Sequence, residues 1–403
     1  MKIHRRGFLG AAATSAAAAH PAVKDLDSLR ESFPRALQET YLDAAAHCPL
    51  SRHTAEGIRR YLDFHMYGPG EGRGEYVSRA MKEVRSMFAG LINAKPSEIA
   101  LVHCTKAGEN IVVQGLDIQA SGGNVVTNDL HYAGSLHNYI GHRKHGMDVR
   151  IVRARNWAIN VKDMEAAIDR KTRLVAITPV SNVNGHIEDT KAISEIAHAR
   201  GAYVYADIIQ GAGIVPIDVR ALGIDFAACS NYKWLQGVRG AGFLYVREEL
   251  QGKVLRDLLY PGYVYFNYPP WVDRPDPAKE ELPYREPANA SRYEPGNINY
   301  AGYVGQYETF RVMEAIGVER MFEHTLKLVN RLKKELPEKA YRLITPPGQK
   351  TPIATLIPRD IEDTRARLKR VGVQVTLIGN RMRVSPGPYN NERDIDRLLE
   401  ALT

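Results

Sequence analysis

The sequence predicts an α/β protein, with a mostly parallel central sheet in a large domain and a smaller α+β domain at the C-terminus. Two observations carry this prediction. Short apolar runs alternate with helical segments, as in 99–102 before 109–113, and 174–177 before 191–196. The chain also has 403 residues, of which 44% are hydrophobic, which is enough for two lobes with substantial cores.

We divide the chain into four parts in order. Residues 1–19 form a leader, 20–55 an N-terminal segment, 56–299 the large domain, and 300–403 the small domain. A single long helix is expected to open the small domain, running from Tyr300 to Leu336.

The leader has the pattern of an export signal. Arg5 and Arg6 stand side by side, Phe8 and Leu9 follow, and an alanine-rich stretch runs to Ala19. A basic start, a mildly apolar middle and small residues at the end are typical of a twin-arginine signal peptide. The apolar part is too short for a membrane span, so we expect no stable membrane insertion. The expected location is periplasmic or otherwise exported, and an uncleaved tail is the alternative.

Composition argues against several classes of function. The formal net charge is +8, and three of the basic residues lie in the leader, so the excess gives no case for nucleic acid binding. Four histidines, at 131, 137, 142 and 145, are close in sequence but match no ligand motif, so no metal site is expected. The glycines at 237, 240 and 242 do not follow the dinucleotide fingerprint, which disfavours a nicotinamide enzyme.

Lys233 is the strongest candidate for a catalytic residue. The apolar run 224–228 leads into a small polar turn that holds Ser230, Tyr232 and Lys233. Burial at the end of a strand disfavours the ammonium form of a lysine and frees a nucleophilic amine. Such an amine forms a Schiff base with an aldehyde cofactor. The alternative for this position is an ordinary solvated lysine.

Asp207 strengthens the hypothesis of an aldehyde cofactor. It interrupts the apolar segment 202–211 near its end, and an aspartate is rarely buried without a cationic partner. The protonated ring nitrogen of pyridoxal phosphate (PLP) is such a partner, and Gln210 is then placed to hydrogen-bond the ring hydroxyl. The spacing to Lys233 fits one strand–helix–strand unit. Asp207 as the cap of a following helix is the alternative.

These residues resemble a known family. Asp207-x-x-Gln210 followed by Ser230-x-x-Lys233 is similar to the class V aminotransferases, a family of fold-type I PLP enzymes that includes cysteine desulfurases and isopenicillin N epimerase-like proteins. The resemblance runs from about Tyr41 to the C-terminus. It implies the fold-type I architecture, PLP as cofactor, and a homodimer with shared active sites.

The resemblance also assigns roles to residues around the cofactor. The turn 102–110 would hold the phosphate through Thr105, Lys106 and Ala107 at a helix N-terminus, where free N–H groups favour an anion. His131 would stack on the ring, and Asn182 would lie near the ring hydroxyl. Thr105 as an ordinary helix cap and His131 as a core residue are the alternatives.

Further positions complete the implied site. Ser230 and Tyr232 would finish the phosphate cup, and Asn297, where the family more often has threonine, would reach a phosphate across the dimer interface. Arg383 would bind the substrate carboxylate, because a planar guanidinium suits a bidentate carboxylate. A surface ion pair is the alternative for Arg383.

The cysteines limit the choice of reaction. The chain has Cys48, Cys104 and Cys229, and none lies in the C-terminal lobe, where a desulfurase of this family carries its persulfide-forming thiol. Desulfuration by that route is therefore disfavoured, and all three are expected to be small buried thiols.

The sequence thus predicts a PLP-dependent enzyme that acts on an amine or amino acid through a Lys233 Schiff base. Transamination is the first choice of reaction, and epimerase or lyase chemistry is the second. An exported binding protein that has lost catalysis is a further alternative.

Overall fold

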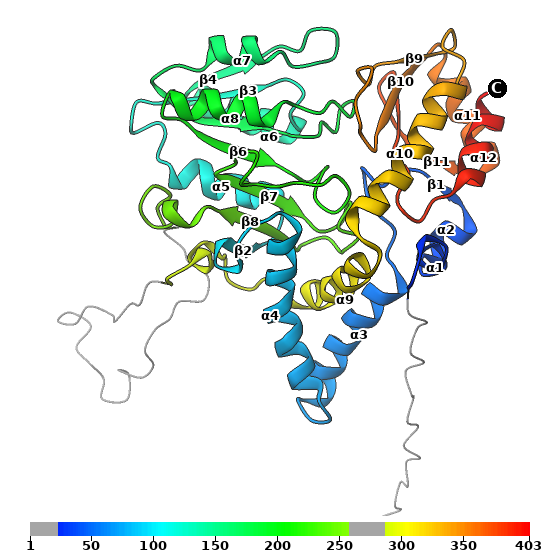
Figure 1. Ribbon diagram of the computed structural model, residues 1–403, viewed down its shortest axis with the longest axis horizontal. Coiled ribbons are helices and arrows are strands. Elements are labelled where there is room, and N and C mark those ends of the chain that lie inside the picture. Colours follow the sequence, from blue (N-terminus) through cyan, green and yellow to red (C-terminus); the bar gives the residue numbers. More distant parts are fainter. Residues whose placement is uncertain (1–22, 258–286) are drawn as a thin grey trace, which may run out of the picture.

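The computed structural model describes residues 23–257 and 287–403 (Figure 1). The leader at 1–19 lies outside these residues. The main sheet has seven strands in the order β2-β8-β7-β6-β5-β3-β4. Among its pairs, β8 is antiparallel to both neighbours and the others are parallel, as predicted. The strands are β2 (Ile99–Val102), β3 (Asn124–Asn128), β4 (Asp148–Val152), β5 (Thr172–Ile177), β6 (Tyr203–Asp207), β7 (Phe226–Ser230) and β8 (Gly242–Val246).

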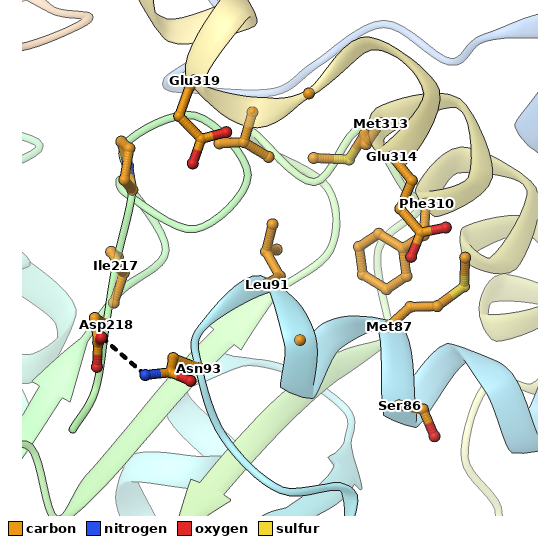
Figure 2. A pocket seen from close by; sticks show the side chains of 14 residues that line it. Ser86, Met87, Leu91, Asn93, Ile217, Asp218, Phe310, Met313, Glu314 and Glu319 are labelled. Atoms are coloured by element: carbon orange, nitrogen blue, oxygen red, sulfur yellow. Dashed lines mark hydrogen bonds between the residues drawn. The ribbon is translucent and has the colours of Figure 1, made fainter.

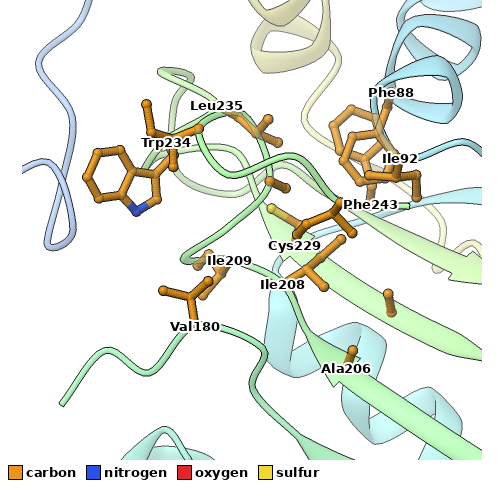
Figure 3. Close-up of a cluster of buried hydrophobic side chains, with 14 of the residues drawn as sticks. Phe88, Ile92, Val180, Ala206, Ile208, Ile209, Cys229, Trp234, Leu235 and Phe243 are labelled. Carbon is orange, nitrogen blue, oxygen red and sulfur yellow. The ribbon is translucent and has the colours of Figure 1, made fainter. Parts of the chain in front are cut away.

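Both faces of this sheet are covered, which explains why its strands are almost continuously apolar. Neighbouring residues of one strand enter different cores: Leu101 and Val175 belong to one cluster, and Ala100 and Leu174 to another. Figure 3 shows part of the first cluster, where Phe88 stacks on Phe243 with ring centroids 4.0 Å apart. The covering helices include α5 (Thr105–Gly115), α6 (Ala133–Lys144), α7 (Val161–Ala167) and α8 (Thr190–Ala199).

Three long helices pack together beside the sheet: α3 (Arg52–Tyr67), α4 (Arg73–Leu91) and α9 (Tyr300–Ile316). Glycines bring α3 and α9 unusually close. A Cβ atom at Gly57 would lie 2.7 Å from the Val304 carbonyl oxygen, and one at Gly305 would lie 3.0 Å from that of Thr54. Any larger residue would push these two helices apart.

The helix expected from Tyr300 to Leu336 is two helices. α9 ends at Ile316, and α10 (Val318–Glu335) begins after Gly317. Gly317 has φ +89°, which an α-helix cannot accommodate and which glycine adopts without steric cost. The apolar period continues across the break, and only the backbone conformation reveals it.

The second sheet has four antiparallel strands in the order β12-β13-β10-β9, and α10, α11 and α12 pack with it around a separate core. A short parallel pair, β1 with β11, joins the N-terminal segment to this unit. The remaining bounds are β1 (Thr40–Tyr41), β9 (Tyr341–Leu343), β10 (Ala354–Pro358), β11 (Val373–Gln374), β12 (Thr376–Ile378), β13 (Arg381–Val384), α1 (Leu26–Glu31), α2 (Pro34–Gln38), α11 (Ile361–Val371) and α12 (Glu392–Leu402).

The two sheets fall within the predicted ranges 56–299 and 300–403, whose exact boundaries stay a prediction. Within the described part of the chain, no helix is both long and apolar enough to cross a bilayer.

Candidate active site

A cavity of about 130 Å³ lies at the carboxyl ends of β5, β6 and β7 and faces the start of α5. Ligands of open α/β sheets bind at this edge. The cavity brings together eight of the twelve predicted site residues, namely Thr105, Lys106, Asn182, Asp207, Gln210, Ser230, Tyr232 and Lys233. It is also lined by Cys104, Tyr132, Thr178 and Ile209.

Lys233 is buried, with 7% of its surface exposed, in the turn after β7. Burial lowers the pKa of its amine from 10.5 to about 8, although the carboxylate of Asp207 works in the opposite direction. Arg383 contributes to the lowering through its positive charge. The amine is therefore far more available as a nucleophile than a solvated lysine, and the solvated alternative is excluded by the burial.

Asp207 ends β6 and is 2% exposed. Burial raises the pKa of its carboxyl group above the usual value, and the charge of His131 partly offsets this. Its Oδ1 accepts a hydrogen bond from the Ile209 N–H group at 3.1 Å. Within the described residues Asp207 makes no ion pair, and its buried carboxyl group lines the cavity.

Thr105 and Ser230 tie the start of α5 to the end of β7. The Thr105 N–H group donates to Ser230 Oγ at 2.8 Å, and the Ser230 N–H group donates to Thr105 Oγ1 at 2.9 Å. Thr105 is the first residue of α5, and the cap is Cys104, whose Sγ accepts from the Ala107 N–H group at 3.4 Å. The first turn of α5 is thus fixed against the cavity, where its dipole favours an anion.

Gln210 is held from both ends of its amide. Its Nε2 donates to the Ala45 carbonyl at 3.0 Å, and its Oε1 accepts from Trp234 Nε1 at 2.8 Å. The amide is therefore fixed in place at the edge of the cavity, and Nε2 keeps a second hydrogen for a ligand.

Arg383 lies outside the cavity lining but is linked to it. It belongs to β13, is 9% exposed, and its Nη1 donates to the carbonyl of cavity-lining Asn182 at 2.9 Å. Nη2 donates to Thr376 Oγ1 at 3.0 Å and lies 3.5 Å from Asp43 Oδ1. Burial lowers the pKa of the guanidinium. Arg383 is thus a buried cation at the junction of the two sheets, not a member of a surface ion pair.

Besides Arg383, three predicted residues are not in the lining. Ala107 lies in the first turn of α5, and Asn297 precedes α9, where its carbonyl faces His103 Nε2 at 3.3 Å. His131 is buried, and its Nδ1 accepts the N–H of Tyr132 at 2.8 Å. The next residue, Tyr132, lines the cavity in its place.

Sequence reasoning missed four lining residues. Thr178 directly follows β5, Tyr132 directly follows His131, and Ile209 lies between Asp207 and Gln210. Nearness to a strand end or to a predicted site residue was therefore the available signal. Cys104 was expected to be buried, as Cys48 and Cys229 are, but it is partly exposed and lines the cavity. Cys104 is partly exposed because a residue that caps a helix turns its side chain toward the first N–H groups of the helix, and those groups border the cavity.

Behind the cavity lies a buried polar cluster around Glu109, which the sequence did not single out. Glu109 Oε2 accepts from Lys106 Nζ at 2.6 Å and from Ser135 Oγ at 2.6 Å. Burial raises the pKa of Glu109, but the charges of His131 and Lys106 outweigh it and the net shift is downward. Glu109 is therefore a buried carboxylate directly behind the predicted phosphate site.

Comparisons with known proteins settle the family. The family model described as aminotransferase class-V matches residues 40–398. The chain belongs to the class V aminotransferase family. A probable cysteine desulfurase of Methanothermobacter thermautotrophicus is 33% identical over 312 residues, covering 76% of this chain and 74% of the relative. An uncharacterized aminotransferase, YcbU, of Bacillus subtilis is 25% identical, covering 93% of this chain and 97% of the relative.

Solved structures share the fold. The cysteine desulfurase CsdA of Escherichia coli matches with a TM-score of 0.80 at 21% identity, covering 93% of this chain and 97% of that one. The cystine C–S lyase C-DES, solved with its product cysteine persulfide, matches with a TM-score of 0.79 at 19% identity, covering 92% and 98%. The predicted fold-type I class is confirmed.

PLP is the cofactor of class V aminotransferases, which confirms the predicted cofactor for this member. The residues present fit it. The buried Asp207 carboxyl, which has no ion pair among the residues described, suits the protonated ring nitrogen. The start of α5 suits the phosphate, and the Lys233 amine, with its pKa lowered to about 8, suits the aldehyde.

Proposed function

We propose that this class V enzyme is an aminotransferase for an α-amino acid. The observation that supports this most is the placement of one buried amine, Lys233, in the same cavity as the buried carboxyl group of Asp207. When bound, PLP supplies an electron sink for the negative charge that develops when a bond to the substrate Cα breaks.

Lys233 would hold and move the proton. An amine with a pKa of about 8 exists in both protonation states near neutral pH, so it can accept a proton from Cα and return one. Desolvation is the main cause of the lowered pKa of Lys233, so the amine keeps this pKa only while the cavity excludes water.

Arg383 would orient the substrate. Its guanidinium is held by hydrogen bonds to Asn182 and Thr376, and its buried Nε has no hydrogen-bond partner in the part of the chain that the structure describes. A carboxylate of the substrate would accept a hydrogen bond from the Arg383 guanidinium and would compete with the Asp43 carboxylate for its positive charge. The substrate class that fits is therefore an amine bearing a carboxylate, as in an α-amino acid.

A lyase that cleaves the Cβ–S bond of a sulfur amino acid is the second candidate. The fold neighbour C-DES is a cystine C–S lyase, and several relatives are cysteine desulfurases. The chain has no cysteine after Cys229, so a persulfide on a thiol of the C-terminal lobe is not available to it. Elimination needs no such thiol, because sulfide or persulfide leaves directly.

Product analysis separates the two reactions. The holoenzyme is incubated with each amino acid in the presence and absence of a 2-oxo acid acceptor. Transamination yields a new amino acid only when the acceptor is present, whereas elimination from cysteine or cystine releases pyruvate and ammonia without it. Release of pyruvate and ammonia without an acceptor would contradict the aminotransferase proposal.

Variants test the residues in the same assay. Lys233→Ala and Asp207→Asn should each lower turnover by at least about 100-fold. Lys253→Ala, at an exposed lysine, is the matched control and should leave turnover unchanged. Unchanged turnover in Asp207→Asn would contradict the role of its carboxylate, and a lack of turnover in the unmodified holoenzyme with every amino acid would favour a binding protein.

We also propose export through the twin-arginine route and a homodimer with shared active sites. The pair Arg5 and Arg6 supports the first, and Arg5→Lys with Arg6→Lys should leave the protein in the cytoplasm in a fractionation experiment. For the second, sedimentation should give twice the mass of the chain, and Asn297→Ala should weaken PLP binding only in the dimer. A monomer with full PLP affinity would contradict the shared site.

A further inference from the structure

A second and larger cavity, of about 520 Å³, lies away from the active site (Figure 2). It forms where the last turns of α4 and α9 meet the first turn of α10, with the segment 216–218 closing one side. It shares no lining residue with the cavity around Lys233. Its volume falls in the range of roughly 300–1,000 Å³ that is typical of small-molecule sites.

The floor of this cavity is apolar and adaptable. Leu91, Ile217 and Phe310 line it together with two methionines, Met87 and Met313. Phe310 and Met313 are each 2% exposed and belong to the main core, so the floor is anchored. Figure 2 shows the Phe310 ring beside the opening between α4 and α9. Methionine adapts to irregular ligands, and an aromatic face attracts cations.

The rim of the cavity is acidic. Asp218, Glu314 and Glu319 line it, and among the described residues no lysine, arginine or histidine does. Asp218 is engaged in local structure, since its carboxylate accepts from Asn93 Nδ2 at 2.8 Å and from backbone N–H groups. Within the described chain, Glu314 and Glu319 have no ion pair, which leaves two carboxylates available to a ligand.

The backbone adds to the negative potential. α4 ends at Leu91 and α9 ends at Ile316, so the carbonyl ends of two helix dipoles meet at the cavity. The N-terminus of α10 would oppose them, but Glu319 lies in its first turn. The rim is therefore a negatively charged region on a chain whose formal net charge is +8.

We propose that this cavity binds a small organic cation. Its ammonium group would face Glu314 and Glu319, and an aromatic or branched apolar body would fill the floor formed by Met87, Phe310 and Met313. The negative charge of the rim favours a cation as the ligand. The apolar floor disfavours a small hydrated cation, because it offers no polar groups to replace the lost water. Since the lining includes both sides of the break at Gly317, the ligand contacts α9 and α10 together.

Calorimetric titration of the holoenzyme with trimethyl(2-phenylethyl)ammonium tests the proposal. A quaternary nitrogen has no N–H group and cannot condense with the cofactor, so the active site is not a competing covalent site. Saturable binding is expected, with no change in the visible spectrum. Tetramethylammonium, which lacks the apolar body, and 3-phenylpropanoate, which has the opposite charge, should each bind at least about tenfold more weakly.

Variants locate the site. Glu314→Gln combined with Glu319→Gln should weaken binding of the probe by about tenfold. Glu323→Gln is the matched control, because Glu323 is exposed on α10, one turn further along and outside the cavity, and it should leave binding unchanged. Leu91→Trp, which fills the cavity, should abolish binding while the visible spectrum stays that of the unmodified holoenzyme.

Three results would overturn the proposal: no saturable binding of the probe, equal affinity in the unmodified and double-glutamine proteins, or equal affinity for the phenylpropanoate anion. A spectral change on addition of the probe would place it at the active site and would also overturn the proposal.

Discussion

Replacing Lys233 by methionine should stabilise the cofactor-free protein at neutral pH and have little effect at high pH. The amine is buried, and burial lowers its pKa from 10.5 to about 8 in the folded state. Below pH 8 it is an ammonium in both the folded and the unfolded chain, and the folded protein bears the desolvation penalty. Between pH 8 and 10.5 only the folded chain loses the proton, so the stability of the unmodified protein rises across that window.

The size of the effect follows from the shift. A difference of about 2.5 units corresponds to roughly 3 kcal/mol in the free energy of unfolding. Lys233→Met keeps a side chain of similar length without the charge, so it should gain roughly 3 kcal/mol at pH 7 and much less at pH 10.5. The gain should therefore shrink as pH rises through 8.

Urea unfolding of the PLP-free protein at pH 7 and at pH 10.5, followed by circular dichroism, measures this difference. Lys253→Met, at an exposed lysine, is the control and should change stability by less than about 0.5 kcal/mol at either pH. An equal effect of Lys233→Met at both pH values, or a loss of stability at pH 7, would refute the assignment of a buried, destabilised ammonium.

Two further substitutions probe the surroundings of the cavity. Burial raises the pKa of Glu188 to about 8, whereas in the unfolded chain it ionises near 4.5. The free energy of unfolding should therefore fall by roughly 5 kcal/mol from pH 4.5 to 8 because of this group. Glu188→Gln should reduce that fall, as measured by urea unfolding at pH 5 and 8. An unchanged pH dependence in the variant would contradict a raised pKa of Glu188. Arg383→Lys should raise KM for α-amino acids by about tenfold or more and leave the rate with amines that lack a carboxylate unchanged. Equal losses with both substrate types would indicate a structural role.

The sequence predicts the strand-end part of the site well, because parallel strands must end at the same edge of the sheet. Asp207 and Ser230 are each the last residue of a buried strand, and this alone brings them together. Local pattern does not tell which side of a turn a residue faces. His131 and Tyr132 are adjacent, yet only the second lines the cavity. The rotation of that turn depends on hydrogen bonds such as the one from Tyr132 N–H to His131 Nδ1.

Long-range placement could not be derived from the residues alone. Arg383 meets the carbonyl of Asn182 across 201 positions of sequence, and only the family resemblance pointed to it. The break at Gly317 was missed for a different reason. Apolar residues continue in helical register on both sides, so periodicity predicts one helix, whereas the positive φ of a single glycine turns the chain.

Lys106 and Glu109 bear on how the phosphate site acquires its charge. Lys106 was predicted to hold the phosphate as part of the first turn of α5, and its side-chain amine donates to the fully buried carboxylate of Glu109 at 2.6 Å. The two charges largely cancel, so the helix amides of α5 carry more of the attraction for an anion. Lys106→Met removes the ion pair and a hydrogen bond from a buried carboxylate and leaves it with His131 and Ser135, so it should lower the free energy of unfolding by roughly 3 kcal/mol.

Adding Glu109→Gln to Lys106→Met should then recover most of that loss, since the amide oxygen can still accept from Ser135 Oγ and no charge is left buried. Urea unfolding of the two single variants and the double variant forms the cycle that measures this coupling. If the effects of the two single substitutions simply add, Glu109 is not balanced by Lys106, and the positive charge of Lys106 is free to act on the phosphate instead.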